Sequence, residues 1–142
     1  MNFVESSILN SGRNRLYFPI DGHGVPINDI TSKLFKMFPS LKAAVDRNKK
    51  KRQIGSVEEY TGFFGDVTIC LVVALYDGER GDNVHHLTTV AVRLLAHFQE
   101  LLTNTSVAVA TLTTDVAGRV VETNILEGIF KGLDITIDYH WS

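Results

Sequence analysis

Histidine is the residue type in this sequence best suited to acid–base or metal chemistry, and one histidine lies in a glycine-rich turn. Asp21, Gly22, His23 and Gly24 follow one another. A histidine beside a carboxylate can act as a general acid or base, or as a metal ligand. However, two glycines are also typical of an ordinary tight turn, and the sequence places no second ligand or nucleophile at a diagnostic spacing. An ordinary turn is therefore the preferred interpretation, and an enzyme or ligand-binding module that uses the Asp21–His23 turn is the alternative.

A second group of histidines lies near the start of a predicted helix. His85 and His86 are adjacent, and His97 follows much later. Adjacent helical residues point about 100° apart, so these two side chains are expected to diverge. Zinc-binding helices usually place their ligands at i and i+4, but positions 89 and 90 hold Thr and Val. The pattern therefore predicts no metal site.

Other groups give no stronger sign of catalysis. Asp134 and Asp138 alternate along a predicted strand, roughly 13 Å apart, which is too far for most carboxylate pairs that share a substrate. The sequence contains neither a nucleophile elbow nor a phosphate-binding loop, and its single cysteine, Cys70, lies in an apolar run. We therefore predict no catalytic, cofactor-binding or metal-ligating residue, no cofactor and no enzymatic activity.

The basic run Lys49, Lys50, Lys51 and Arg52 is the one candidate binding segment. Four adjacent cations can contact phosphates without reading sequence, so this run is a possible DNA-facing or partner-facing site. The alternative is a loop kept solvated by its charges, because a charge run alone specifies no partner.

Composition sets the broad class. The 142 residues are 44% hydrophobic and 21% charged, with a net charge of -2, which is typical of one globular domain over residues 1–142. Such a charge creates no global attraction to nucleic acid or membranes. The start of the sequence does not resemble a secretory signal, and its longest apolar run, residues 69–76, is too short to span a bilayer.

The first 64 residues have the less regular pattern. Residues 1–12 are ambiguous, with a short helix as one interpretation. Residues 16–20 predict a strand and residues 28–38 a helix that ends before a proline. Residues 40–47 predict further helical turns.

Residues 65–142 are strongly patterned. Residues 66–76 predict a strand that is apolar on both faces, either central in a sheet or facing another subunit. Residues 82–104 predict a long amphipathic helix. Its apolar stripe comprises Leu87, Val90, Ala91, Leu94, Leu95, Phe98, Leu101 and Leu102.

Three strands are expected after this helix. Residues 106–113 predict one, residues 119–125 a strand that returns after a turn, and residues 132–141 an alternating last strand with one polar face. The order strand, helix, strand, strand, strand predicts an α+β fold. We expect a mostly antiparallel sheet packed against one long amphipathic helix, with shorter N-terminal helices.

The pattern of residues 65–142 resembles tail-terminator and tail-completion (neck) proteins of long-tailed bacteriophages. The resemblance rests on the apolar strand of residues 65–76, the helix from Asp82, and the aromatic-rich strand of residues 132–141. It implies a structural subunit of the virion tail or neck, most simply a ring-forming tail terminator that joins the tail tube to the head–tail connector. A head-completion or neck-adaptor protein is the alternative within this class.

The resemblance also implies partners and a location. It predicts a homo-oligomeric ring, possibly a hexamer, that is assembled in the host cytoplasm, with other tail or neck proteins as neighbours. DNA would pass through the lumen and make non-specific contacts, and no membrane would be involved.

Overall fold

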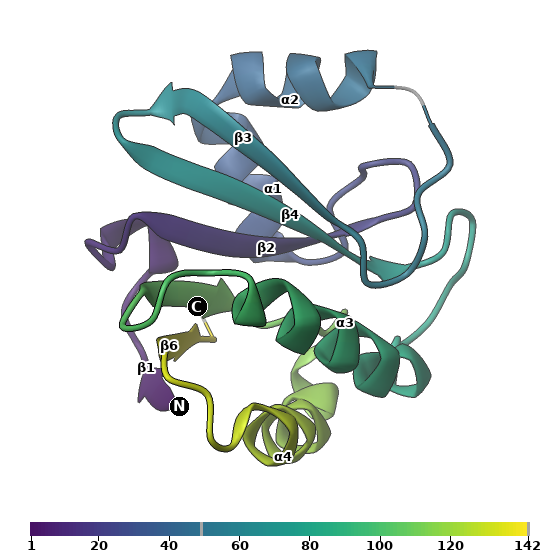
Figure 1. The fold of residues 1–142 in the computed structure, drawn as a ribbon. Coiled ribbons are helices and arrows are strands. Elements are labelled where there is room, and N and C mark those ends of the chain that lie inside the picture. The colour runs from purple at the N-terminus through teal and green to yellow at the C-terminus, as the bar shows by residue number, and fades with distance from the viewer. Residues whose placement is uncertain (49, 142) are drawn as a thin grey trace.

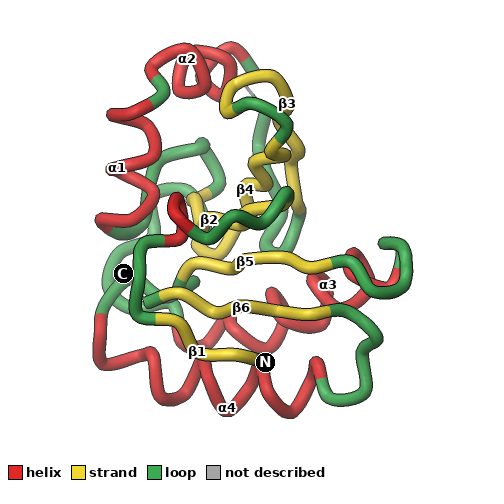
Figure 2. The backbone as a smooth tube through the Cα atoms, turned by 90° about the vertical axis from the view of Figure 1, so that its left-hand side faces the viewer, coloured by secondary structure: helices red, strands yellow, loops and turns green. Residues whose placement is uncertain are grey.

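The computed structural model describes residues 1–48 and 50–141, which form a six-stranded sheet with helices on both of its faces (Figures 1 and 2). The strands are β1 (Asn2–Val4), β2 (Arg15–Asp21), β3 (Val57–Phe64), β4 (Val67–Leu75), β5 (Ser106–Ala110) and β6 (Thr136–His140). The helices are α1 (Asp29–Met37), α2 (Pro39–Arg47), α3 (Leu87–Gln99) and α4 (Arg119–Phe130). Short 3-10 turns are η1 (Ile8–Asn10), η2 (Val84–His86) and η3 (Val116–Gly118).

The sheet is mixed, with the strand order β1-β6-β5-β2-β4-β3. Only β3 and β4 pair antiparallel among the described strands, and all the other neighbours run parallel. The α+β class is therefore confirmed, but the expected mostly antiparallel sheet and single long helix are wrong. Parallel neighbours need crossover connections, and α1, α3 and α4 lie in those connections.

Strand β4 is central and covered on both faces, as one of the two interpretations of its sequence predicted. Its side chains are buried from Ile69 to Leu75. Helices α1 and α2 lie on one face of the sheet, while α3 and α4 pack against each other on the opposite face (Figure 2). The same chain therefore covers both apolar faces of β4, and a neighbouring subunit is not needed to cover them.

Helix α3 confirms the predicted amphipathic stripe. Leu87, Val90, Ala91, Leu94 and Phe98 are all buried on it. The helix ends at Gln99, five residues earlier than expected, so the last leucines of the stripe lie beyond it. Leu101 packs at the margin of the core, but Leu102 is 84% exposed.

Helix α4 replaces the returning strand expected over residues 119–125. Glu122, Leu126 and Phe130 are buried at four-residue intervals, which is the spacing of one helical face. Val120 and Val121, which favoured a strand in the sequence, are exposed. Glu122 interrupts the apolar pattern on the buried face, so the sequence did not indicate a helix here.

Strand β6 is shorter than the expected strand of residues 132–141, and its second face is not wet. Asp138 is only 8% exposed, because β1 pairs beside it and Asn2 lies opposite. Its carboxylate accepts hydrogen bonds from Arg13 Nε at 2.7 Å and Asn2 Nδ2 at 3.0 Å. Although burial opposes the change, these two hydrogen bonds lower the pKa of Asp138. The N-terminal residues thus form β1 and η1, and the side chains of Asn2 and Arg13 bind the Asp138 carboxylate.

Candidate functional site

A cleft of about 240 Å³ lies at the carboxyl ends of β2 and β5. These strands are parallel neighbours, but the chain leaves β2 toward α1 on one face and leaves β5 toward α4 on the other. Ligands of open parallel sheets bind in the crevice at such a switch of direction. Residues 27–30 line one side of the cleft, and Thr111, residues 113–116 and Arg119 line the other.

The loop that follows β2 is held by its own aspartate. Asp21 Oδ1 accepts hydrogen bonds from the backbone N–H groups of His23 at 2.8 Å and Val25 at 2.9 Å. Gly24 has a φ of +85°, and a Cβ there would lie 2.6 Å from a Val45 methyl group, so only glycine fits. The Asp21 carboxylate is therefore occupied with its own loop.

His23 does not form a pair with the Asp21 carboxylate. Its Nε2 lies 2.6 Å from Asp77 Oδ2, in the loop that follows β4, and both side chains are exposed. The structure thus brings His23 to a different carboxylate from the one beside it in sequence. His97 lies apart from the other histidines, where its Nε2 is 2.6 Å from the Tyr17 hydroxyl.

Asn28 joins the two loops that border the cleft. As the N-cap of α1, its Oδ1 accepts hydrogen bonds from the N–H groups of Ile30 and Thr31. Its Nδ2 donates to the carbonyls of Thr111 at 2.9 Å and Thr113 at 3.1 Å. One amide side chain therefore fixes the start of α1 and the end of β5 relative to each other.

A buried carboxyl group supports the second loop from below. Glu122 accepts hydrogen bonds from Thr111 Oγ1 at 2.8 Å, from the Leu112 N–H at 2.6 Å and from the Tyr139 hydroxyl. Burial raises the pKa of Glu122 to about 6, despite these three donors. Burial and the neighbouring carboxyl of Glu122 also raise the pKa of Tyr139.

Arg119 gives the cleft its positive charge. It opens α4 and lines the cleft, and its Nε is buried without a hydrogen-bond partner among the described residues. A buried donor of this kind is normally satisfied, so an acceptor on a ligand would complete it. The carboxylates of Asp29 and Asp115 line the same cleft and can accept hydrogen bonds from hydroxyl groups. The cleft therefore suits a ligand with both anionic and hydroxyl groups.

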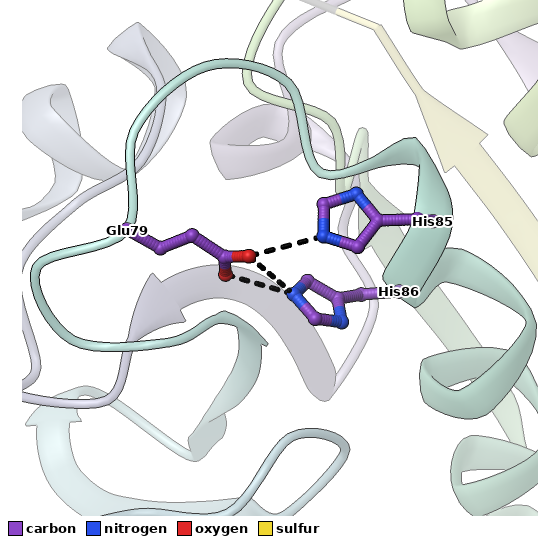
Figure 3. A group of neighbouring side chains, drawn as sticks. All are labelled: Glu79, His85 and His86. Atoms are coloured by element: carbon purple, nitrogen blue, oxygen red, sulfur yellow. Dashed lines mark hydrogen bonds and ion pairs between the residues drawn. The ribbon is translucent and has the colours of Figure 1, made fainter.

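A second cluster contradicts the expectation that His85 and His86 diverge. Both rings reach the same Glu79 carboxylate, with Nε2–Oε1 distances of 3.0 Å for His85 and 3.1 Å for His86 (Figure 3). The ring centroids lie only 4.0 Å apart, although adjacent residues of a 3-10 turn step by about 120°, because both side chains bend toward the Glu79 carboxylate. Although burial opposes the change, hydrogen bonds from His86, the Tyr76 N–H and His85 lower the pKa of Glu79 to about 2.

The basic run is divided by the structure. Lys49 lies outside the described residues, Lys50 and Lys51 are exposed, and Arg52 is buried with its Nε 2.8 Å from Glu58 Oε2. Arg52 also donates to the Val45 and Asn48 carbonyls, so its guanidinium is occupied inside the protein. Contact of Lys50 and Lys51 with DNA or a charged partner stays a prediction.

Sequence reasoning did not find the cleft. Asn28 carried a usable signal, since an asparagine before a helical pattern is a common N-cap. Glu79 carried a weaker one, an acid six and seven residues before two histidines. Arg119 carried none, because it lay in a segment interpreted as a strand.

The comparisons identify the architecture. No protein-family model and no curated protein sequence matches the chain. Solved structures do match it. The macrodomain of Thermus aquaticus DarG superposes with a TM-score of 0.80 at 16% identity, covering 99% of this chain and 97% of that one. The macrodomain of Mycobacterium tuberculosis DarG gives a TM-score of 0.80 at 17% identity, with the same two coverages. The chain has a macrodomain fold. The macro domain of GDAP2 also matches, with a TM-score of 0.70 at 12% identity, covering 97% of this chain and 74% of that one.

The macrodomain fold overturns the resemblance to phage proteins. The pattern of residues 65–142 that suggested a tail-terminator or neck subunit belongs to a macrodomain sheet instead. The expected ring or hexamer, the tail and neck partners, the DNA-filled lumen and the location in a virion all depended on that resemblance, and they are wrong with it. Among the described residues, no helix is both long and apolar enough to cross a membrane.

Proposed function

We propose that this macrodomain binds ADP-ribose in the cleft between the β2–α1 and β5–α4 loops. Macrodomain matches point to modules that bind or hydrolyse ADP-ribose. The observation that carries the proposal for this chain is the buried, unpartnered Nε of Arg119 beside the cleft. The proposal replaces the assembly-subunit hypothesis and agrees better with its ligand-binding alternative, although the cleft is not built on the Asp21–His23 turn.

The chemistry of the ligand matches the lining of the cleft. A diphosphate carries negative charge and acceptor oxygens, which suit the guanidinium of Arg119 and the N-terminal end of α1. Ribose hydroxyls are donors that suit the carboxylates of Asp29 and Asp115. Because Asn28 ties the two loops together, the cleft is largely preformed, and less ordering is needed when a ligand binds.

Hydrolysis of an ADP-ribosyl bond is a second candidate, so the expectation of a protein without enzymatic activity is no longer supported. Asp29 and Asp115 present exposed carboxylates at the cleft. A carboxylate within reach of water can act as a general base. Water would then add to the ribose anomeric carbon, the bond to the leaving group would break, and the proton would pass to that group.

Isothermal titration calorimetry with ADP-ribose, AMP and ribose 5-phosphate tests binding. We expect saturable binding of ADP-ribose, weaker binding of the two fragments, and a roughly 10- to 100-fold loss for Arg119→Ala, which is the size of a hydrogen bond to a charged group. Lys131→Ala is the matched control, because it removes a charge at the opposite end of α4 and should not alter affinity.

The binding proposal is wrong if the folded wild-type protein does not bind millimolar ADP-ribose, or if Arg119→Ala and Lys131→Ala bind it equally well.

Incubation with an ADP-ribosylated peptide distinguishes the binding module from the hydrolase. If the wild-type protein releases free ADP-ribose and Asp29→Asn or Asp115→Asn does not, the protein is a hydrolase. If the wild-type protein binds the peptide without releasing ADP-ribose, it is a binding module.

A further inference from the structure

We infer that Glu79, His85 and His86 form a binding site for a divalent transition-metal ion, with Zn²⁺ as the ion of choice. The cluster lies in the segment between β4 and α3 (Figure 3). None of its three residues is among those that line the cleft. The inference does not depend on ADP-ribose binding.

The geometry of the three side chains is close to that of a metal site. One ligand atom from each residue can be chosen so that all lie within 4.8 Å of one another. In a tetrahedral zinc site with bonds of about 2.0–2.1 Å, neighbouring ligand atoms are roughly 3.3 Å apart. The Nε2–Oε1 distances of 3.0 and 3.1 Å are already near that value, so an ion needs only small side-chain movements to fit.

The surrounding loop holds the carboxylate in position. The Tyr76 N–H donates to Glu79 Oε2 at 3.1 Å, and the Tyr76 ring packs edge-on against His86 with centroids 5.1 Å apart. Gly78 and Gly81 have φ values of +73° and +88°, which allow the chain to turn tightly on both sides of Glu79. The backbone therefore directs Glu79 toward the histidines rather than into solvent.

The ligand set selects the class of ion. Two imidazole nitrogens and one carboxylate suit first-row divalent ions such as Zn²⁺, Co²⁺ and Ni²⁺, whereas Mg²⁺ and Ca²⁺ prefer oxygen ligands. Three protein ligands leave one tetrahedral position for water or for a ligand atom.

Metal titration of the chelator-treated protein tests the site. We expect one equivalent of Zn²⁺ to bind, and Co²⁺ to give the visible absorption of a tetrahedral complex. His86→Ala and Glu79→Gln should each weaken Zn²⁺ binding by more than the roughly 10- to 100-fold that loss of an outer-shell partner costs a zinc site. Glu79→Gln keeps the size of the side chain, so the loop can still fold if His86→Ala disturbs it.

His23→Ala is the matched control, since His23 is an exposed histidine that pairs with Asp77 outside the cluster. It should leave Zn²⁺ affinity unchanged. Equal losses in His23→Ala and Glu79→Gln would mean that surface histidines bind zinc non-specifically, and the inference would be overturned. The absence of any saturable binding to the wild-type protein would overturn it as well.

Discussion

Glu122 is a carboxyl group held in the core directly beneath the cleft. It is fully buried, and its three hydrogen bonds fix the end of β5 through Thr111 and Leu112. Burial nevertheless raises its pKa from 4.5 to about 6, so the charged form is less favourable in the folded protein than in the unfolded chain. A group of this kind contributes stability when protonated and loses that contribution as the pH rises through its folded-state pKa.

The contribution of Glu122 should therefore be complete below pH 4.5 and lost by about pH 6. The shift corresponds to about 2 kcal/mol in the free energy of unfolding. Glu122→Gln cannot ionise, so its stability relative to the wild type should improve by about that amount between pH 4.5 and pH 6.5. Urea denaturation across this range measures the difference.

Glu127→Gln is the control for this experiment, because Glu127 is an exposed residue on the same helix. Its stability difference from the wild type should be nearly independent of pH. If the Glu122→Gln difference were equally flat, the carboxyl of Glu122 would not be titrating in this window.

Single residues are also where sequence reasoning about this protein was least complete. The hypothesis that His85 and His86 diverge considered only the angular step between adjacent helical residues, but the loop that precedes their 3-10 turn places Glu79 where both side chains reach it. Neither the turn type nor the return of that loop has a strong sequence signal. Local periodicity alone therefore could not reveal the cluster.

At the scale of elements, α3 is the best test of the core. Leu94 is fully buried in its stripe. Leu94→Ala should lower the free energy of unfolding by about 2–5 kcal/mol, because it removes buried methyl groups and leaves a cavity. Leu102→Ala makes the same chemical change at a site that is 84% exposed and should have an effect below about 0.5 kcal/mol. Equal effects in urea denaturation would show that the stripe does not form the core.

Elements with a strong periodicity could be predicted from sequence, and the others could not. The strand at β2 and the helices α1, α2 and α3 lie close to where the patterns predict them. Strand β3 was missed because adjacent Glu58 and Glu59 interrupt its alternation and its residues are all half-buried or exposed. The direction of β6 relative to β5 was missed because α4 was interpreted as a strand, which turned a crossover into a hairpin. The parallel pairing of β5 with β6 depends on that helix.

At the scale of the whole molecule, the sheet is covered by helices of the same chain. Helices lie on both faces, so β4 leaves no apolar face that requires another subunit (Figure 1). We therefore expect a monomer in solution. Light scattering after size-exclusion chromatography should give a mass near 15.8 kDa at micromolar concentration. A stable particle with several-fold greater mass would contradict this expectation.

The cleft is a property of the whole molecule, which explains why sequence analysis did not find it. Asn28 and Thr111 are 83 residues apart and meet only because β2 and β5 are neighbours in the sheet. No local sequence motif indicates that β2 and β5 are neighbours. Correct strand order would have placed both loops at one crevice, and the candidate residues would have followed from it.

The nearly all-parallel strand order has a further consequence, for folding kinetics. The β3–β4 hairpin is the one local pairing among the described strands, whereas β2 and β5 pair across some ninety residues, with Leu16 opposite Ala108. The pairing of β1 with β6 spans almost the whole chain, with Asn2 opposite Asp138. Such distant pairings give a high contact order, and the entropy of loop closure must be overcome before they contribute stability. Folding should therefore be slower than in a helical protein of the same length, with the sheet edge at β1 depending on both ends of the sequence.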